Sequence, residues 1–436
     1  MKVAFADYSD DADISGVTTW LAKFVAFLVG VQPPGTVRTA LHLHHIGTHG
    51  WRDSSIAREL AGVPVELSGR RIGEVRYTED AVQDTLAFLA ATRPDVFLPQ
   101  CLPGFHFAAR IAAQAGLPWV LTVHADDPDY WGLVEECCPD AAHGACVAVS
   151  EYLAARVRER RPESRVVTIP CGVQVPATTT RFSAAPFRVV YSGRLVEHQK
   201  RASLVIESLL EACRRCGRIE VIVMGDGAAR PSMEAAVSAA GLADRICFTG
   251  RLTPEAVGRR LQESQAILLM SDFEGLPVAL MEAMAAGVVP VARSIASGVG
   301  ELVHDGVTGI LVDDVPAHAA AALVRLAEGP AEAWQAMSTA ARRLVADRYA
   351  DTVCFARWRA LLEELAATAT IRHPLDVPRS ISLAPVHPLN RRMDSRRPRG
   401  WRRLEHAALA GARRLRRAAA IVATRLGLRA ARDAAR

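Results

Sequence analysis

The sequence predicts an α/β fold with two doubly wound parallel sheets that face each other across a cleft. Three observations lead to this expectation: short apolar segments alternate with helical ones, the alternation occurs twice, and an irregular stretch separates the two runs. The chain has 436 residues, half of them hydrophobic, which is too many for one core and enough for two.

The first half, residues 1–175, contains the first alternating set. The predicted strands are Val3–Tyr8, Ala40–Ile46, Val63–Leu67, Val96–Pro99, Trp119–His124, Cys146–Val149 and Val166–Ile169. The predicted helices include Gly16–Val29, Thr78–Ala91, Phe105–Ala115 and Glu151–Arg160. In sheets of this kind, ligands bind beyond the carboxyl ends of the strands.

An irregular stretch at residues 176–186, rich in Thr, Ala and Ser, is expected to link two domains. The second alternating set begins at Phe187 and belongs to a predicted domain of residues 187–333. Residues 334–368 have a helical pattern with a break near Tyr349, and residues 369–436 are expected to form a linker and a tail.

Residues 271–285 carry two glutamates where a predicted strand turns into a helix. Glu274 follows the apolar run of the strand, and Glu282 lies in a helical pattern that begins near Leu276. Pro277 suits a first helical position, and such a turn presents backbone N–H groups to an anion. With carboxylates on both sides to accept hydrogen bonds from hydroxyls, the turn suits a nucleotide sugar. The alternative is a charge near a helix start and a solvated helix residue.

This stretch resembles the donor-site signature of the retaining GT-B glycosyltransferases, the large family that includes glycogen and sucrose synthases and bacterial mannosyltransferases (glycosyl transferases group 1). The resemblance covers most of residues 1–365 and is strongest from Val189 to Val312. It implies two Rossmann-like domains, with residues 334–368 crossing back to the first. Other matching segments follow in order: Val190–Leu195 with Gln199–Arg201, Met224–Gly227, Phe248–Arg251, Glu301–Val303 and Gly306–Leu311.

The resemblance implies that Arg194 and Lys200 clamp the donor diphosphate, Arg through its fork geometry and Lys as a point charge. The alternative is solvated surface charge, the usual state of these residues. Many members have glycine after the lysine, whereas this chain has Arg201, which leaves open whether Arg201 also reaches phosphate. The resemblance also assigns donor binding to Gly193, Gly225 and Arg251.

The same resemblance assigns the remaining donor contacts to residues 271–285. Glu274 is expected to bind the donor sugar, and Glu282 is expected to bind the ribose hydroxyls. Backbone contacts are expected from Gly275, Leu276 and Pro277.

His124 ends a predicted strand at the position of a family histidine that contacts the donor sugar. The alternative is a histidine that caps the strand end or packs on Tyr130 and Trp131. The first strand is followed by Ser15 and Gly16, where the family often has two glycines and where Gly16 permits close approach of a ligand. The alternative for this loop is an ordinary turn.

Four histidines, His42, His44, His45 and His49, form a second cluster. His42 and His44 share one face of a strand, and His45 takes the other face. A metal site is one alternative. With no carboxylate or cysteine at hand, acceptor-side or structural roles are expected, and no metal site is expected from the Asp11–Asp13 triplet either.

The resemblance implies transfer of a hexosyl unit from a nucleotide-diphosphate sugar to an acceptor hydroxyl, with retention of configuration and without a metal or another cofactor. The acceptor would be a sugar or a lipid-linked sugar. Three alternatives are a non-catalytic nucleotide-sugar-binding relative, a sugar-nucleotide epimerase and a phosphorylase. A phosphorylase would need a lysine for pyridoxal phosphate, and the chain has only Lys2, Lys23 and Lys200.

The nine cysteines form no disulfide framework, and Cys213 and Cys216 lack a second pair for a zinc site. Buried reduced thiols are expected, which is typical of the cytosol. The first residues read as a strand followed by aspartates and not as a signal peptide. The apolar stretch at residues 20–31 is too short to span a bilayer.

Residues 390–436 hold 15 Arg against three acidic residues, so the basic balance of the chain belongs to this tail. Its apolar residues recur at spacings of three and four, which predicts a basic amphipathic helix on an anionic membrane surface. The alternative is a flexible solvated tail. Nucleic-acid binding is not expected, because aromatic residues for base stacking are almost absent. A cytoplasmic enzyme, peripheral on the inner face of the membrane, is therefore expected.

Overall fold

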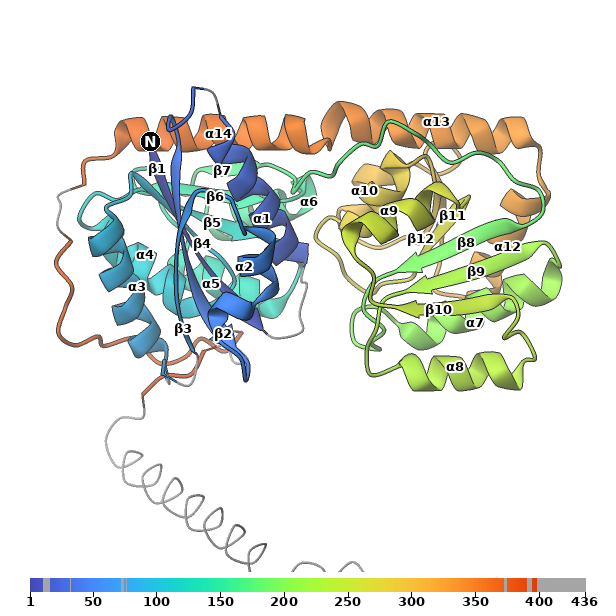
Figure 1. The fold of residues 1–436 in the computed structure, drawn as a ribbon, viewed down its shortest axis with the longest axis horizontal. Coiled ribbons are helices and arrows are strands. Elements are labelled where there is room, and N and C mark those ends of the chain that lie inside the picture. The colour runs from blue at the N-terminus through green and yellow to red at the C-terminus, as the bar shows by residue number, and fades with distance from the viewer. Residues whose placement is uncertain are drawn as a thin grey trace, which may run out of the picture.

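The computed structural model describes residues 1–10, 16–31, 33–71, 74–75, 77–371, 375–389 and 394–397. Two parallel sheets with helices packed on them lie side by side, and a long helical segment runs along one side of both (Figure 1). The predicted α/β fold with two sheets is confirmed. Ser15 and most of the predicted basic tail lie outside the described residues.

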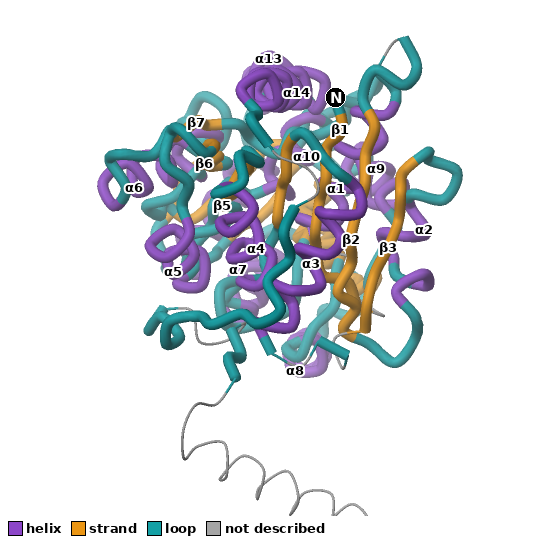
Figure 2. The backbone as a smooth tube through the Cα atoms, turned by 90° about the vertical axis from the view of Figure 1, so that its left-hand side faces the viewer, coloured by secondary structure: helices purple, strands orange, loops and turns teal. Residues whose placement is uncertain are grey.

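The first sheet has seven parallel strands in the order β3-β2-β1-β4-β5-β6-β7, and Figure 2 shows them side by side. The strands are β1 (Lys2–Asp10), β2 (Arg38–Ile46), β3 (Val65–Arg71), β4 (Val96–Pro99), β5 (Trp119–Val123), β6 (Gly144–Ala148) and β7 (Val166–Thr168). Every residue of β4, β5 and β6 is buried, because helices cover both faces of the sheet centre.

Helices of the first half lie on both faces of this sheet. They are α1 (Gly16–Val29), α2 (Ser55–Glu59), α3 (Thr78–Thr92), α4 (Pro103–Ala113), α5 (Pro128–Cys137) and α6 (Glu151–Arg160), with a 3₁₀ turn η1 at Trp51–Asp53. Helix α1 packs on one face, and α3 and α4 pack together on the other. The predicted bounds of α1 and α6 are confirmed.

The second sheet has six parallel strands in the order β10-β9-β8-β11-β12-β13. The strands are β8 (Phe187–Ser192), β9 (Ile219–Met224), β10 (Ile246–Gly250), β11 (Ala266–Leu269), β12 (Val289–Arg293) and β13 (Ile310–Val312). The helices are α7 (Ala202–Arg215), α8 (Arg230–Ala239), α9 (Pro254–Gln262), α10 (Val278–Ala285), α11 (Val299–Leu302) and α12 (Pro316–Glu328).

The last two helices, α13 (Ala331–Arg348) and α14 (Asp351–Thr368), carry the chain from the second sheet back to the first (Figure 1). The break between them at Tyr349 confirms the predicted interruption. Trp358 of α14 packs against Trp20 and Phe24 of α1, with ring centroids 5.4 and 5.7 Å apart. Helix α14 is thus built into the core of the first half.

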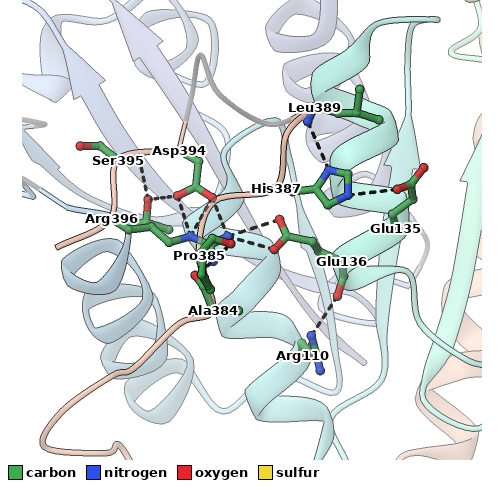
Figure 3. Close-up of polar contacts among 11 residues, drawn as sticks. Arg110, Glu135, Glu136, Ala384, Pro385, His387, Leu389, Asp394, Ser395 and Arg396 are labelled. Carbon is green, nitrogen blue, oxygen red and sulfur yellow. Dashed lines mark hydrogen bonds and ion pairs between the residues drawn. The ribbon is translucent and has the colours of Figure 1, made fainter. Parts of the chain in front are cut away.

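Residues 375–389 and 394–397, called the strap here, lie against α3, α4 and α5. Arg396 is its main anchor: its guanidinium donates to Asp394 and Glu136 (Figure 3). The same guanidinium lies 4.8 Å from the Phe107 ring centroid. Thr78 Oγ1 donates to Asp394 Oδ1 over 2.7 Å. These contacts fix the place where the basic tail leaves the described chain.

Two local expectations are corrected. Helix α10 begins at Val278, so Pro277 is its N-cap and not its first helical residue. Pro277 has an extended ψ, and its carbonyl oxygen accepts the N–H groups of Leu280 and Met281. Helix α5 was not predicted, because it begins with polar residues. Asp127 is its N-cap and accepts the N–H of Asp129.

Candidate functional site

The turn between β11 and α10 brings Glu274 to the edge of the second sheet that faces the first half. Glu274 is 6% exposed. Gly275 lies against the backbone of His124, since a Cβ on Gly275 would stand 2.0 Å from the His124 carbonyl oxygen. Only a residue without a side chain permits this approach, so Gly275 sets how closely the two halves meet.

Lys200 and Glu274 form an ion pair at the centre of this turn. The Lys200 Nζ lies 2.5 Å from Glu274 Oε1, and the two side chains are 15% and 8% exposed. Lys200 comes from the loop after β8, whereas Glu274 comes from the loop after β11, the neighbouring strand. The structure therefore unites two sequence-predicted site residues that lie 74 positions apart.

Backbone and side-chain hydrogen bonds hold the two loops together. The Asp272 N–H donates to the Gln199 carbonyl oxygen over 2.8 Å, and Gln199 Nε2 donates to the Phe273 carbonyl oxygen over 3.3 Å. Arg201, which stands where many family members have glycine, donates to the Asp272 carboxylate over 2.8 Å. Arg201 therefore has a structural role in joining the two loops. Gln199 and Asp272 were not predicted as site residues, because their partners lie in the other loop.

Arg194 is exposed, and its Nη2 donates to Gln199 Oε1 over 2.7 Å. Gly225 lies against Gly193, since a Cβ on Gly225 would stand 1.9 Å from the Gly193 carbonyl oxygen. Arg251 follows β10 directly and is exposed. The carboxyl ends of β8, β9, β10 and β11 thus gather predicted donor residues at one edge, with Arg194 and Arg251 facing solvent.

His124 follows β5 and is enclosed by aromatic rings of the first half. Its ring nitrogen Nε2 lies 2.9 Å from Gln100 Oε1, and the ring centroids of Trp20 and Tyr130 are 5.4 and 6.1 Å away. Burial lowers the pKa of His124 to about 3, with a further contribution from His106. His124 is therefore a neutral imidazole at physiological pH. It both packs on Tyr130 and touches the Glu274 turn through its backbone.

Glu282 is half-buried on α10 and faces the first half. Burial raises the pKa of Glu282, and the charge of Lys23 on α1 acts in the opposite direction. Glu282 is the fifth residue of α10, just over one helical turn beyond the Glu274 turn, and it lies near α1 of the first half. The first residue of α1, Gly16, is exposed, and no atom of the described residues lies within 4 Å of a Cβ placed on it.

A further contact between the halves involves Glu301 of α11. Its carboxylate accepts the N–H of Glu151 over 3.2 Å and that of Tyr152 over 3.0 Å, at the start of α6. A carboxylate is favourable there, because the first N–H groups of a helix are unpaired and carry partial positive charge. The Gly298 N–H donates to the Gly275 carbonyl oxygen over 3.0 Å. The sequence pattern alone did not predict this role for Glu301.

The histidine cluster has a carboxylate partner, contrary to expectation. Asp84 of α3 lies between two histidines of β2, with its Oδ2 at 2.7 Å from His42 Nε2 and 3.0 Å from His44 Nε2. Asp84 stands 42 positions after His42, which is why no local pattern revealed it. Burial raises the pKa of Asp84, but hydrogen bonds from His42, His44 and Arg70 hold it well below its usual range. Burial lowers the pKa of His44.

Two family models match consecutive parts of the chain. Residues 40–175 match Glycosyltransferase Family 4, and residues 180–344 match Glycosyl transferases group 1. The first match covers most of the first sheet, and the second covers the second sheet together with most of α13.

Curated relatives match over part of their length. The amylovoran biosynthesis glycosyltransferase AmsK of Erwinia amylovora is 34% identical over 188 residues, which are 42% of this chain and 46% of that protein. The alpha-D-kanosaminyltransferase of Streptomyces kanamyceticus is 34% identical over 124 residues, which are 28% of this chain and 32% of that protein. The chain thus spans less than half the length of these two relatives.

Solved structures share the fold. The sucrose-phosphate synthase of Thermosynechococcus elongatus has a TM-score of 0.67 at 17% identity, over 84% of this chain and 100% of that chain. Anabaena Alr3699/HepE in complex with UDP and glucose has a TM-score of 0.65 at 17% identity, with the same coverage. At this identity the likeness concerns the arrangement of the two sheets.

Proposed function

The chain belongs to the glycosyl transferases group 1 family, and we propose that it moves a hexosyl unit from a nucleotide-diphosphate sugar to an acceptor hydroxyl with retention of anomeric configuration. The observation that carries this proposal is the buried ion pair of Lys200 and Glu274, at the carboxyl ends of neighbouring strands and next to His124. Ligands of doubly wound sheets bind at such strand ends.

In the proposed reaction, Lys200 and Arg194 stabilise the negative charge that develops on the departing diphosphate. Preorganised cations of this kind supply the largest share of many rate enhancements. The glycosidic bond to phosphate breaks, the acceptor oxygen bonds to the anomeric carbon on the same face, and the acceptor proton passes to the departing phosphate. We assign no protein nucleophile and no metal to this step.

The positions of the side chains support the other proposed donor contacts. When the diphosphate draws Lys200 toward it, Glu274 becomes free to accept hydrogen bonds from sugar hydroxyls. The N–H groups of Gly275 and Leu276 lie in the same turn. Glu282, which faces the first half, takes the ribose hydroxyls, and His124 contributes as a neutral group near the sugar.

The names of the relatives support a role in cell-surface polysaccharide or glycolipid assembly, with a sugar or lipid-linked acceptor. They include proteins of amylovoran and colanic acid biosynthesis and a lipopolysaccharide galactosyltransferase. All nine cysteines are free thiols, which supports a reducing, cytoplasmic compartment. Among the described residues, no helix is both long and apolar enough to cross a membrane. Membrane contact through residues 390–436 stays part of the proposal.

The test is a thermal-shift series with UDP, GDP, ADP and their common sugar conjugates, followed by assay of the best donor. A ligand that binds the folded chain raises the unfolding midpoint. The shift should disappear in Arg194→Ala and persist in Arg359→Ala, a control that breaks an exposed pair on α14. Product with inverted configuration would contradict retention. Binding without turnover on any sugar acceptor would favour a non-catalytic relative.

A further inference from the structure

The cluster of His42, His44 and Asp84 brings together three metal-binding groups from two elements of the first half. One ligand atom from each residue lies within 4.8 Å of the others. His42 and His44 are 4% and 1% exposed. They stand two positions apart on β2, so both rings point to the same face of the sheet, where α3 supplies Asp84.

The surroundings of the cluster fix the two rings. His42 stacks on Phe88 of α3 with centroids 4.9 Å apart, and His44 lies against Phe105 of α4 at 4.6 Å. Rings held in this way lose little further conformational entropy when they bind an ion. The site is therefore preorganised by the packing of α3 and α4 against β2.

We propose that His42, His44 and Asp84 form a zinc site, with water as the fourth ligand. Two imidazoles and one carboxylate are a ligand set that zinc accepts, at distances of about 2.0–2.2 Å. Tetrahedral bonds of that length hold ligand atoms roughly 3.4 Å apart. The present separations of 2.7 and 3.0 Å to Asp84 Oδ2 would widen by about 0.7 and 0.4 Å to reach that value.

A neighbouring hydroxyl supports the required tautomer of His42. Zinc needs the lone pair of Nε2, so the ring hydrogen has to reside on Nδ1. On His42 that nitrogen lies 2.8 Å from Ser68 Oγ, which can accept the hydrogen bond. Partners of this kind orient metal-binding histidines and strengthen metal binding by about 10–100-fold.

Arg70 is the cation that now competes for the carboxylate. Its Nε donates to Asp84 Oδ1 over 3.1 Å, and its side chain is 58% exposed. A long exposed side chain can move into solvent when an ion binds, while the buried histidines stay in place. The effect of Arg70 therefore distinguishes two explanations of the cluster. Arg70 would stabilise a polar network without a metal, but it would weaken the binding of zinc.

The site lies apart from the donor residues, so it does not depend on the proposed function. His42 and His44 face α3 and α4, whereas α1, with Gly16 and Lys23, packs on the opposite face of the sheet. Zinc here would join β2 to α3, the helix that also holds the strap through Thr78. Its expected effect is on the stability of the first half and not on the chemical step.

The test is zinc titration of the full, EDTA-treated chain against a chromophoric chelator, with cobalt as a spectroscopic probe. We expect one tightly bound zinc per chain and a raised unfolding midpoint. His42→Ala and His44→Ala should each weaken binding by roughly 100-fold. Ser68→Ala should weaken it by about 10-fold, whereas Arg70→Ala should strengthen it. His143→Ala, which removes an exposed histidine, should leave affinity unchanged.

Three results would overturn the site. One is the absence of stoichiometric zinc binding by the wild-type chain. Another is weaker binding by Arg70→Ala, which also keeps the test decisive if the histidine variants do not fold. The third is a cobalt spectrum dominated by thiolate charge transfer, which would place the metal on cysteines instead.

Discussion

At the residue scale, the pair of Lys200 and Glu274 is the feature on which the proposed chemistry depends. Both side chains are largely removed from water, and each supplies the counter-charge of the other. A buried charge that loses its partner is costly, because it gives up hydration without compensation. In the proposed reaction, Lys200 exchanges the carboxylate for the diphosphate, and Glu274 exchanges the ammonium for hydrogen bonds from sugar hydroxyls.

We predict that Lys200→Ala lowers the free energy of unfolding by about 2–3 kcal/mol, because Glu274 stays buried and unpaired. The variant should also lose roughly 1,000-fold in kcat. The double variant Lys200→Met with Glu274→Gln should regain stability without regaining turnover. Urea unfolding and product formation measure the two effects. Full activity in Lys200→Ala would remove its catalytic role.

Asp7 of β1 shows how burial controls a single charge. It is 0% exposed, and its Oδ2 has no hydrogen-bond partner among the residues that the structure describes. Its Oδ1 accepts only the N–H of Tyr8 among the contacts described, over 2.8 Å. Burial raises the pKa of Asp7 to about 8, against a smaller opposite effect of the Tyr8 hydrogen bond.

We predict that stability falls as pH rises from about 4 to about 8, with a slope of up to ~1.4 kcal/mol per pH unit from Asp7. In this window the folded chain keeps a proton that the unfolded chain releases, so rising pH favours unfolding. Asp7→Asn should remove this part of the slope, while Asp140→Asn, which changes an exposed side chain, should not. Urea midpoints across the range test this, and parallel curves for wild type and Asp7→Asn would contradict it.

At the scale of elements, the strap shows how a segment without regular structure becomes part of a domain. Asp394 has a side chain that is 0% exposed, and Arg396 covers it at 7% exposure. Arg396 also reaches Glu136 at the end of α5 and the carbonyl oxygen of Pro385 (Figure 3). One guanidinium thereby joins the strap to itself and to the helices beneath it.

We predict that Arg396→Ala loosens the strap, since Asp394 is then left buried without its cation. Hydrogen exchange of residues 375–389 should become at least ~10-fold faster, with a loss of about 2–3 kcal/mol in local stability. The pair Arg396→Met with Asp394→Asn should restore most of the protection. Unchanged exchange in the single variant would show that apolar contacts hold the strap.

At the scale of the whole molecule, the two halves meet through glycines and one carboxylate. Gly275 approaches the His124 backbone, a Cβ on Gly298 would stand 3.1 Å from the Ser150 Cβ, and Glu301 caps α6 of the other half. Helices α13 and α14 join the same halves on the outside. The distance between the Glu274 turn and the first half thus depends on glycine positions at which no side chain fits.

We predict that Gly275→Ala forces the halves apart, because its Cβ would stand 2.0 Å from the His124 carbonyl oxygen. The expected result is a loss of roughly 100-fold in kcat/KM, as for other displacements of about 1 Å at a reacting centre. Stability of each sheet should change little. Gly300→Ala is the matched control, since no atom lies within 4 Å of its Cβ. Equal activity of both variants would contradict the role of this contact.

Local sequence patterns determined the elements and the class of fold. The alternation of apolar segments and helices depends on neighbouring residues, so the bounds of α1 and α6 and the break at Tyr349 were predictable. The strand, glycine turn and helix around Glu274 were likewise visible, because their signals are local. The N-cap role of Pro277 was not, because it depends on the ψ angle of one residue.

Only the tertiary structure decided which side chains meet. Glu274 reaches Lys200 across 74 positions, Asp84 reaches His44 across 40, and Asp394 reaches Thr78 across 316. These pairings follow from the order of strands in each sheet and from which helix packs on which face. That order results from burying all apolar surfaces together, and no window of neighbouring residues contains it. The residues of the Glu274 turn were therefore readable from the sequence, whereas the carboxylate partner of the histidine cluster and the contacts of the strap were not.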